Sequence, residues 1–300
     1  MNELRPSHLD EIIGQKNIKN RLEISINAAK KRGEVLQHIL FDGPPGLGKT
    51  TFSQAIANEM GTKIQIANGA NLRSIKQLLP YLMRISKDKH ILFIDEIHRC
   101  AKIVSEFLYP VMEDFRCDIG KETKMTMDLP RFTLIGATTK GGSLPPPLYD
   151  RFITKFHLSF YDVKDLVKLL KMSAAKLNMS IGDDSLEVLA SASRGTPRIA
   201  NSHLLWLRDF CIDLPNITLD SVNKSLKLSG VETNGIDNND RKYLSILDKF
   251  YPNPVGFKTL QSIMGMGADT LSEVIEPFLV RKGIVQITPK GRMRINNPVY

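Results

Sequence analysis

Hydrophobic positions in the first half of the chain form short continuous runs, with helical patterns between them. The runs lie at 38–41, 63–66, 91–94, 132–135 and 155–158. Continuous runs, unlike alternating ones, are typical of strands buried on both faces, as in a parallel sheet covered by helices. Between two of the runs, the stretch 51–60 has its apolar residues at helical spacing, and Gly61 supplies a stop. The pattern predicts an α/β domain over residues 1–158, with helices on both faces of a parallel sheet.

The pattern changes after about residue 161, where strand-like runs give way to helical stripes. One stripe consists of Val163, Leu166, Val167, Leu170 and Ala174. Thr196-Pro197 is typical of a helix start, a cap residue followed by proline at the first helical position, and another helix starts near Thr218. We therefore expect a small all-helical domain over 159–232.

The last part of the chain begins with a polar segment, 232–239, that predicts a linker. Three short helical patterns follow, and then two strand-like runs, IVQI at 284–287 and RMRI at 292–295, around a Thr-Pro-Lys-Gly turn. Three helices and a two-stranded hairpin are the layout of a winged helix, a variant of the helix-turn-helix. We expect this domain over 233–300.

Composition narrows the class of protein. The 300 residues are 42% hydrophobic and 24% charged, which excludes wholesale disorder, and a net charge of +9 favours a polyanionic partner. No apolar run approaches the 18 residues of a membrane span, and the N-terminus lacks the apolar stretch of a signal peptide. Three cysteines without metal-ligand spacing cannot all pair, which favours inert core thiols, a reducing compartment and a cytoplasmic protein.

Residues 43–50, GPPGLGKT, fit the P-loop pattern, with a predicted strand before them and a helix after them. Glycines let backbone N–H groups surround phosphate oxygens, and the helix N-terminus adds positive potential. Lys49 would reach the β- and γ-phosphates of ATP, and Thr50 would bind Mg²⁺. The alternative is a glycine-rich turn with no ligand.

Two acids end the run 91–94 and two arginines lie farther along the chain. Asp95 can bind Mg²⁺ and Glu96 can polarise an attacking water, although such acids also occur in solvated turns. Arg151 precedes the last strand run, and Arg198 lies in the first turn of a helix, where a cation needs an anion nearby to be favourable. Surface salt bridges are the alternative for both arginines.

The C-terminal segment 237–300 carries nine basic and six acidic residues, with no acid after Glu276. The predicted hairpin places Lys290, Arg292 and Arg294 together, and we expect them to contact DNA phosphates independently of sequence. The predicted helix 268–280 is acidic, which disfavours base reading by that helix. A solvated basic tail is the alternative.

Three motifs together are more specific than the P-loop: DEIHR at 95–99, GATT at 136–139 and DTLSEV at 269–274. The run RGTPR at 194–198 also matches the pattern described next. Together with the P-loop, these motifs resemble the AAA+ ATPases and, more narrowly, the RuvB family of Holliday-junction branch-migration motors, nearly end to end. The resemblance implies an ATPase with a helical lid, Mg²⁺ as cofactor, DNA as substrate, a homo-hexameric ring and the junction-binding protein RuvA as partner.

The resemblance also implies roles for individual residues, His98 among them in the coupling region after Glu96. It places Leu4 and Arg5 near the adenine; Gly46, Gly48, Lys49, Thr50 and Thr51 around the phosphates; Thr138 or Thr139 as the γ-phosphate sensor; Tyr161 and Arg198 as further nucleotide contacts; and Arg151 with Glu113, Asp114 and Phe115 at a neighbouring subunit's nucleotide.

The chain departs from the family pattern at three places. Tyr149 and Ile287 stand where arginines are usual, and the segment 116–127, which in the family forms a hairpin that contacts RuvA, is shorter than expected. Two rival functions stay open: another AAA+ remodeller such as a clamp-loader subunit, and a DNA-binding regulator whose P-loop is only a switch. The winged helix disfavours the first rival, and Glu96 with Arg151 disfavours the second, because both residues serve hydrolysis.

Overall fold

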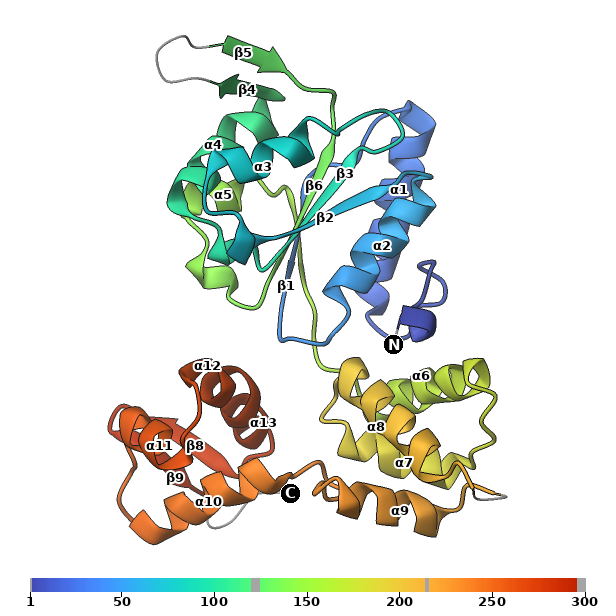
Figure 1. Ribbon diagram of the computed structural model, residues 1–300, viewed down its shortest axis with the longest axis vertical. Helices are drawn as coiled ribbons and strands as arrows, with labels where there is room; N and C mark the ends of the chain where they lie inside the picture. The colour runs from blue at the N-terminus through green and yellow to red at the C-terminus, as the bar shows by residue number, and fades with distance from the viewer. Residues whose placement is uncertain (1, 120–124, 214–215, 296–300) are drawn as a thin grey trace. The chain divides into compact units, whose positions relative to one another are not determined.

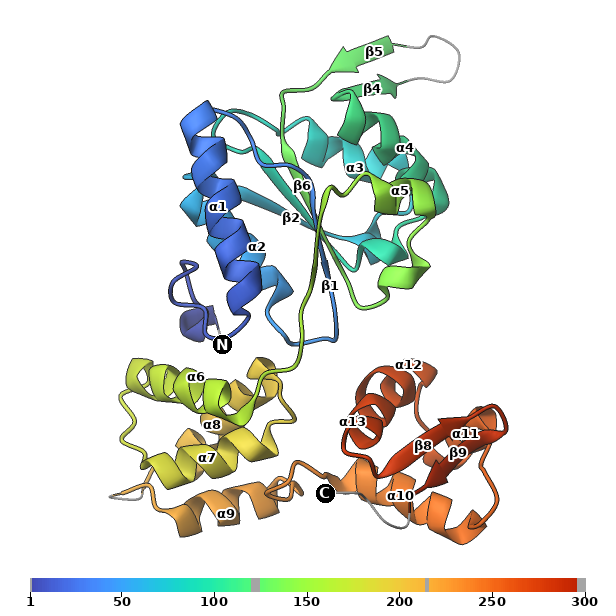
Figure 2. The ribbon, with the colours of Figure 1, turned by 180° about the vertical axis from the view of Figure 1, so that it is seen from behind.

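The structure is a computed structural model that describes residues 2–119, 125–213 and 216–295. It divides into two compact units, Met1–Tyr161 and Asp162–Tyr300. Each unit is shown in the ribbon views of Figures 1 and 2. No helix within the described ranges is long and apolar enough to cross a membrane.

The first unit is built on a five-stranded parallel sheet in the order β2-β3-β6-β1-β7. A separate antiparallel pair, β4 and β5, lies between α4 and β6 in the sequence. The strands are β1 (Ile39–Asp42), β2 (Ile64–Asn68), β3 (Ile91–Asp95), β4 (Arg116–Ile119), β5 (Met125–Asp128), β6 (Thr133–Thr138) and β7 (Thr154–His157). The helices are α1 (Lys16–Arg32), α2 (Lys49–Glu59), α3 (Ile75–Leu82), α4 (Lys102–Glu113) and α5 (Pro146–Asp150), with short 3₁₀ turns at Asn2–Leu4, Gly69–Asn71, Ile97–Arg99 and Gly141–Ser143.

Successive residues of each central strand enter two different cores. Phe41 of β1 packs with α1 and α2, and the preceding Leu40 packs with α3 and α4 on the opposite face. Figure 1 shows the two layers, with α1 and α2 on one side of the sheet and α3, α4 and α5 on the other. The predicted parallel sheet with helices on both faces is therefore confirmed, and each of the five apolar runs forms a strand. Burial of both faces explains why these runs do not alternate.

The second unit contains the predicted helices and the hairpin, plus a helix, α7, that the sequence analysis did not single out. Thr218 caps α9 by accepting a hydrogen bond from the N–H of Ser221, and Pro197 is the first residue of α8. The elements are α6 (Val163–Lys176), α7 (Asp183–Ala192), α8 (Pro197–Phe210), α9 (Leu219–Leu228), α10 (Asn238–Phe250), α11 (Phe257–Met264), α12 (Ala268–Thr270), a π-helical turn (Leu271–Ile275), α13 (Glu276–Arg281), β8 (Val285–Thr288) and β9 (Gly291–Arg294).

The predicted helix over 268–280 is interrupted in the structure. A π-helical turn, Leu271–Ile275, separates α12 from α13, and Pro277 is in the first turn of α13. Because proline has no N–H and its ring clashes with the carbonyl four residues earlier, a regular α-helix cannot run through this point. The π turn resolves the conflict without ending the helical segment.

Candidate functional site

Three of the predicted site segments lie at the same edge of the sheet. β1 leads into the P-loop, β3 ends at Asp95, and β6 ends at Thr138. β6 pairs with both β1 and β3, and Asp42 at the end of β1 is in register with Thr138. Because all three strands are parallel, their carboxyl ends meet at this edge, where ligands bind in open α/β sheets.

The backbone of the P-loop requires glycine. Gly43, Gly46 and Gly48 have φ values of 136°, 81° and 104°, in the region that other residues rarely adopt. A Cβ atom on Gly43 would lie 2.5 Å from the carbonyl oxygen of Leu158. The loop can therefore keep its tight course over the end of the sheet only with glycine at these positions.

Lys49 lies inside this loop. It is 7% exposed, and its Nζ donates hydrogen bonds to the carbonyl oxygens of Gly43 at 2.6 Å and Pro44 at 3.0 Å. Lys49 also begins α2, so Thr50 and Thr51 lie in the first helical turn, where the N–H groups and the helix dipole favour an anion. These residues fit the triphosphate of a nucleotide.

Glu96 follows β3 and is held by two side chains. The Thr139 hydroxyl donates to Glu96 Oε2 at 3.2 Å, and Nδ1 of His98 lies 3.2 Å from the same oxygen. His98 Nδ1 is also 2.9 Å from Oγ1 of Thr138, which is fully buried.

This network has two consequences. Both contacts are made to Oε2, so this oxygen of the Glu96 carboxylate is held from two sides. Both threonines of the GATT motif are connected to Glu96, Thr139 directly and Thr138 through His98. The contacts of Thr138 with His98 and of Thr139 with Glu96 were not evident in the sequence, because they depend on the position of β6 beside β3.

A magnesium site cannot be recognised from protein ligands alone. Within the described ranges, no three His, Cys, Asp or Glu side chains form a metal-binding cluster. Mg²⁺ in nucleotide sites usually takes one or two protein oxygens, with phosphate and water supplying the others. Asp95 Oδ1 accepts the N–H of Glu96 at 3.1 Å, so this half-buried carboxylate has a defined orientation at the end of β3. Thr50 and Asp95 therefore fit the oxygen ligands that Mg²⁺ prefers.

The cysteines fit the prediction of inert core thiols. Cys117 and Cys211 are buried, and none of the three forms a disulfide. Burial raises the pKa of the Cys100 thiol to about 12. Cys100 is therefore a poor nucleophile, because the reactive form is the thiolate.

Arg151 and Glu113 are brought together by the structure. A guanidinium N–H of Arg151 donates to Oε2 of Glu113 at 2.8 Å, and others donate to the carbonyl oxygens of Tyr109 at 3.1 Å and Pro147 at 2.8 Å. The Glu113 side chain is 63% exposed, so the ion pair is weak and can open at low cost. A cavity of about 920 Å³ borders both residues.

The remaining members of the Glu113 segment differ in their surroundings. Asp114 is exposed, and Phe115 packs edge-on against Phe132 with its ring 6.0 Å from that of His38. Phe115 has a φ of 55°, which is costly for a bulky residue. The fold therefore imposes this conformation at the start of the hairpin β4–β5.

Other predicted nucleotide contacts are distributed over both units. The Tyr161 hydroxyl lies 3.5 Å from the carbonyl oxygen of Leu47 in the P-loop. Leu4 is buried, and Arg5 is exposed. Arg198 belongs to the second unit, where its side chain is exposed in the first turn of α8.

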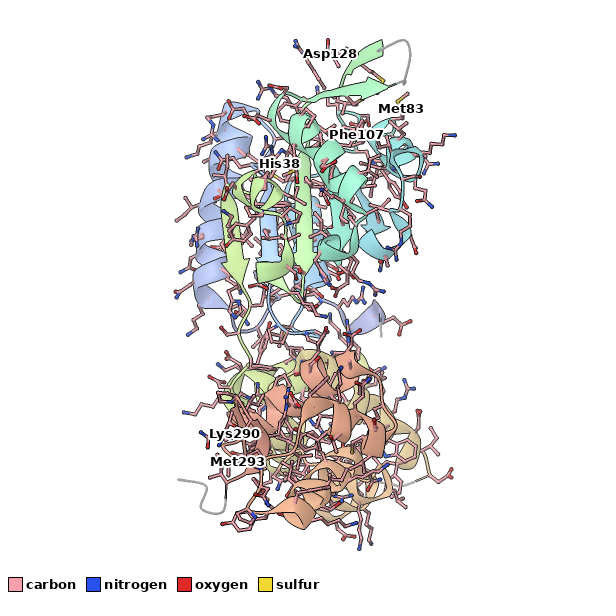
Figure 3. The ribbon with its side chains drawn as sticks, turned by 90° about the vertical axis from the view of Figure 1, so that its left-hand side faces the viewer. His38, Met83, Phe107, Asp128, Lys290 and Met293 are labelled. Carbon is pink, nitrogen blue, oxygen red and sulfur yellow. The ribbon has the colours of Figure 1, made fainter. Side chains whose placement is uncertain are left out.

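The three basic residues predicted to bind DNA differ from one another. Lys290 is exposed at the turn between β8 and β9, as Figure 3 shows. Arg292 donates to both oxygens of Glu276, at 2.9 Å and 3.1 Å, and its guanidinium lies over the ring of Phe257. Arg294 forms an ion pair with Asp248.

The pairing of Arg292 has a structural cause. Glu276 is only 3% exposed, and it also accepts a hydrogen bond from the hydroxyl of Tyr243, which is fully buried. A buried carboxylate is unfavourable unless a cation and hydrogen bonds compensate for its lost hydration. Arg292 supplies that cation, so its first role is in the core of the winged helix.

Comparison with known families covers the chain from end to end. Three sequence models match: the Holliday junction DNA helicase RuvB P-loop domain at residues 4–158, the RuvB AAA lid domain at 161–232, and the RuvB C-terminal winged helix domain at 233–297. The chain belongs to the RuvB family. A RuvB from Myxococcus xanthus is 47% identical, and one from Rhodopirellula baltica 44%, over 97% of this chain and 87% and 81% of the relatives. Both carry the name Holliday junction branch migration complex subunit RuvB.

Solved structures give the same result. The Thermotoga maritima RuvB Holliday junction branch migration motor superposes with a TM-score of 0.90 at 41% identity, covering 98% of this chain and 96% of that one. The structure shows the surroundings of the residues that depart from the expected RuvB pattern. Lys155 Nζ lies 4.1 Å from the ring centre of Tyr149, and Ile287 is 49% exposed on the wing. In the segment 116–127, which we expected to be shorter than is usual in the family, β4 and β5 are paired, and residues 120–124 lie outside the described ranges.

Proposed function

We propose that this chain is the ATP-hydrolysing motor subunit that drives branch migration of four-way DNA junctions. The observation that supports this most strongly is the arrangement at the sheet edge. There, Lys49 lies in a complete P-loop, and Glu96 is held by Thr139 and His98 at the adjoining strand ends. A nucleotide site that contains an oriented carboxylate as general base is suited to hydrolysis. The basic winged helix supplies a separate surface that can bind DNA.

The chain's residues divide the chemical work. The P-loop N–H groups and Lys49 would bind the phosphates. The Glu96 carboxylate would take a proton from the attacking water as the water oxygen bonds to the γ-phosphorus, while the bond from that phosphorus to the β–γ bridging oxygen breaks and ADP leaves. Thr50 and Asp95 would hold Mg²⁺, which neutralises phosphate charge when bound. Arg151 would leave Glu113 and stabilise the charge on a neighbouring subunit's nucleotide, with Glu113, Asp114 and Phe115 lining that contact. Leu4 and Arg5 would contact the adenine.

The proposal includes partners that fit the same assignment. A homo-hexameric ring would place Arg151 of each subunit at the next nucleotide, and the hairpin β4–β5 would contact RuvA. Lys290 would be the principal phosphate contact of the wing. Arg292 and Arg294 would contact phosphate either while they keep their ion pairs with acidic side chains or after those ion pairs open. Reduced cysteines are consistent with a cytoplasmic location.

Neither rival function has a supporting observation of its own. A clamp-loader subunit has no evident use for the wing formed by β8 and β9, and a pure switch would not need Glu96 oriented for proton transfer.

The test is the steady-state ATPase rate with and without synthetic four-way junction DNA. We expect Mg²⁺-dependent hydrolysis that the junction stimulates, and near-complete loss in Glu96→Gln. ATP binding without hydrolysis by the unaltered protein would instead support the switch.

A further inference from the structure

Arg194 has no role in the proposed chemistry, yet it is one of the most constrained residues of the second unit. It lies in the turn between α7 and α8, is 9% exposed and has a φ of 55°. Gly195, with a φ of 72°, completes the turn, and Arg198 follows in the first turn of α8. The turn that presents Arg198 is therefore fixed by its neighbour Arg194.

The side chain of Arg194 binds the winged-helix part of the unit. Its Nε donates to the carbonyl oxygen of Gly235 at 2.8 Å, and one Nη2 contacts Asp237 Oδ2 at 2.7 Å and Asp240 Oδ2 at 2.5 Å. The guanidinium carbon lies 4.3 Å above the ring centre of Phe278. Carboxylates, a carbonyl oxygen and an aromatic face thus surround one planar cation, which is the geometry that arginine recognises best.

The backbone of Arg194 takes part as well. Arg281 Nη2 donates to the Arg194 carbonyl oxygen at 2.5 Å. A Cβ atom on Gly235 would lie only 3.2 Å from both Cγ of Arg194 and the carbonyl oxygen of Ala192, so the two segments are in close contact. We call Arg194, Gly235, Asp237, Asp240, Phe278 and Arg281 the Arg194 cluster.

The acids of the cluster also begin α10. Asp237 accepts the N–H groups of Asn239 and Asp240, and Asp240 Oδ2 accepts the N–H of Asp237, which makes a capping box. Asp240 is fully buried, and burial raises its pKa to about 6 although Arg194 and a backbone hydrogen bond lower it. A buried charge with several partners contributes little net stability, but it defines geometry sharply, because each alternative position leaves polar groups unsatisfied.

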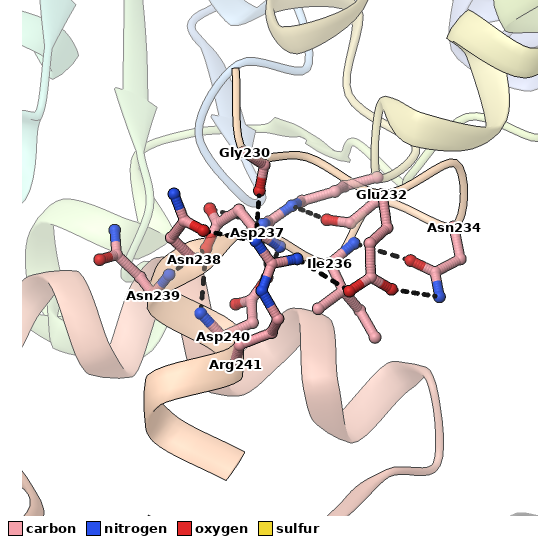
Figure 4. A network of polar contacts seen from close by, with 11 residues as sticks. Gly230, Glu232, Asn234, Ile236, Asp237, Asn238, Asn239, Asp240 and Arg241 are labelled. Carbon is pink, nitrogen blue, oxygen red and sulfur yellow. Dashed lines mark hydrogen bonds and ion pairs between the residues drawn. The ribbon is translucent and has the colours of Figure 1, made fainter. Parts of the chain in front are cut away.

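The segment predicted as a linker is correspondingly ordered, as Figure 4 shows. The N–H of Glu232 donates to Ile236 O at 2.8 Å, and Arg241 donates to Glu232 Oε1 at 2.8 Å and to Gly230 O at 3.0 Å. These bonds close the chain between α9 and α10 into a compact turn. The helical part and the winged helix are therefore joined by more than a polar tether.

We propose that Arg194 is a positioning residue that fixes the Arg198 turn to the winged helix, so that movement of Arg198 with the nucleotide state moves the DNA-binding domain as part of the same rigid body. The inference rests on the proposed function, since it requires Arg198 to sense nucleotide and the wing to hold DNA. Its structural part, a rigid joint, can be tested without either activity.

The main variant is Arg194→Met combined with Asp240→Asn. It removes the guanidinium and the fully buried Asp240 carboxylate together, and the acid that remains, Asp237, has a side chain that is 30% exposed. Met retains apolar contact with Phe278. Arg281→Met is a second variant that removes the bond to the Arg194 carbonyl, in case the double variant fails to fold. The matched control is Arg208→Met on α8, because the partner of Arg208 among the described residues is its exposed neighbour in the sequence, Asp209.

The first readout is cleavage after Glu232 by a glutamate-specific protease, under conditions where the folded protein opens locally before it is cut. We expect the double variant to be cut at least tenfold faster than the unaltered protein, Arg281→Met to shift in the same direction by a smaller factor, and Arg208→Met to be unchanged. Equal cleavage rates in all four proteins would overturn the rigid joint.

The second readout is junction movement per ATP hydrolysed. We expect at least a tenfold fall in the double variant, with the KM for ATP, the basal hydrolysis rate and the duplex DNA affinity all within twofold of the unaltered protein. An open joint with unchanged movement per ATP would overturn the transmission role. If the unaltered protein and Arg208→Met move no junction either, the proposed function itself fails, and the transmission role fails with it.

Discussion

Lys49 in the P-loop and Arg292 in the winged helix are both largely shielded basic side chains, but the fold satisfies them in different ways. Lys49 donates to neutral backbone carbonyls, whereas Arg292 forms a two-point ion pair with a carboxylate that is itself buried. A phosphate that replaces the neutral carbonyls beside Lys49 gains electrostatic attraction. A phosphate that approaches Arg292 must instead displace Glu276, which is itself an anion. A basic residue in a DNA-binding domain can therefore be occupied by an acidic partner of the same domain and so be unavailable to DNA.

Arg151 lies between these extremes, because its acidic partner Glu113 is mostly exposed. Its availability can be tested by mixing Arg151→Ala protein with Lys49→Ala protein. Arginine fingers acting in trans contribute about 10³ to 10⁵ in rate, so each variant alone should be nearly inactive and the mixture should regain measurable ATPase. Mixed rings that form but show no recovery at any ratio would place Arg151 outside the neighbouring nucleotide site.

At the nucleotide site, the comparison predicts that binding and hydrolysis can be separated. Glu96→Gln should slow turnover by roughly 10² to 10⁴ with ATP affinity retained, because the amide keeps the size but cannot accept the proton. Lys49→Ala should weaken ATP binding itself. Equilibrium binding of a fluorescent ATP analogue with single-turnover kinetics distinguishes the two, and an equal loss of affinity in both variants would contradict the division of roles.

In the winged helix, Arg292→Ala should act first on stability. Removing one partner of a buried ion pair costs about 3 to 5 kcal/mol, since Glu276 would be left as an uncompensated charge; the lower end applies here because Arg292 is 19% exposed. Arg294→Ala is the matched control, with an exposed partner and an expected cost of about 0 to 1 kcal/mol. Urea unfolding of both variants measures the difference, and equal midpoints would mean that Arg292 is as dispensable for folding as Arg294.

Lys290→Ala should give the smallest effect and the cleanest reading of DNA contact. Loss of one phosphate contact lowers the slope of log affinity against log salt by about one unit, equally for unrelated duplexes. Lys224→Ala, an exposed lysine on α9 paired with Asp220, should leave the slope unchanged. A loss confined to some sequences, with an unchanged slope, would identify the wing as a base reader.

The parts predicted well from the sequence are those encoded by neighbouring residues. The P-loop, the acids after β3 and the helix starts at Thr196 and Thr218 are contiguous patterns whose geometry follows from local chemistry. Strands that are buried on both faces can also be predicted from the sequence, because every residue of the run must be apolar.

The parts that were not predicted depend on contacts between distant residues. The contacts of Thr138 with His98 and of Thr139 with Glu96 require β6 beside β3. The pair of Glu276 with Arg292 requires the wing to fold back on α13. The sequence contained no local signal for the second contact, because Glu276 is one of three acids in the stretch 268–280 and Arg281 follows it in the same helix. The Arg194 cluster was not predicted either, because helix capping is already a sufficient reason for acids at Asp237 and Asp240.

The central claim is that ATP hydrolysis, with Glu96 as the base, moves DNA. It is tested most directly by following branch migration of a synthetic four-way junction with RuvA present. The unaltered chain should move the junction only with ATP and Mg²⁺, and Glu96→Gln should bind both ATP and junction while moving it at least a hundredfold more slowly. Junction movement at an undiminished rate by Glu96→Gln, or no ATP-dependent movement by the unaltered chain, would contradict the claim.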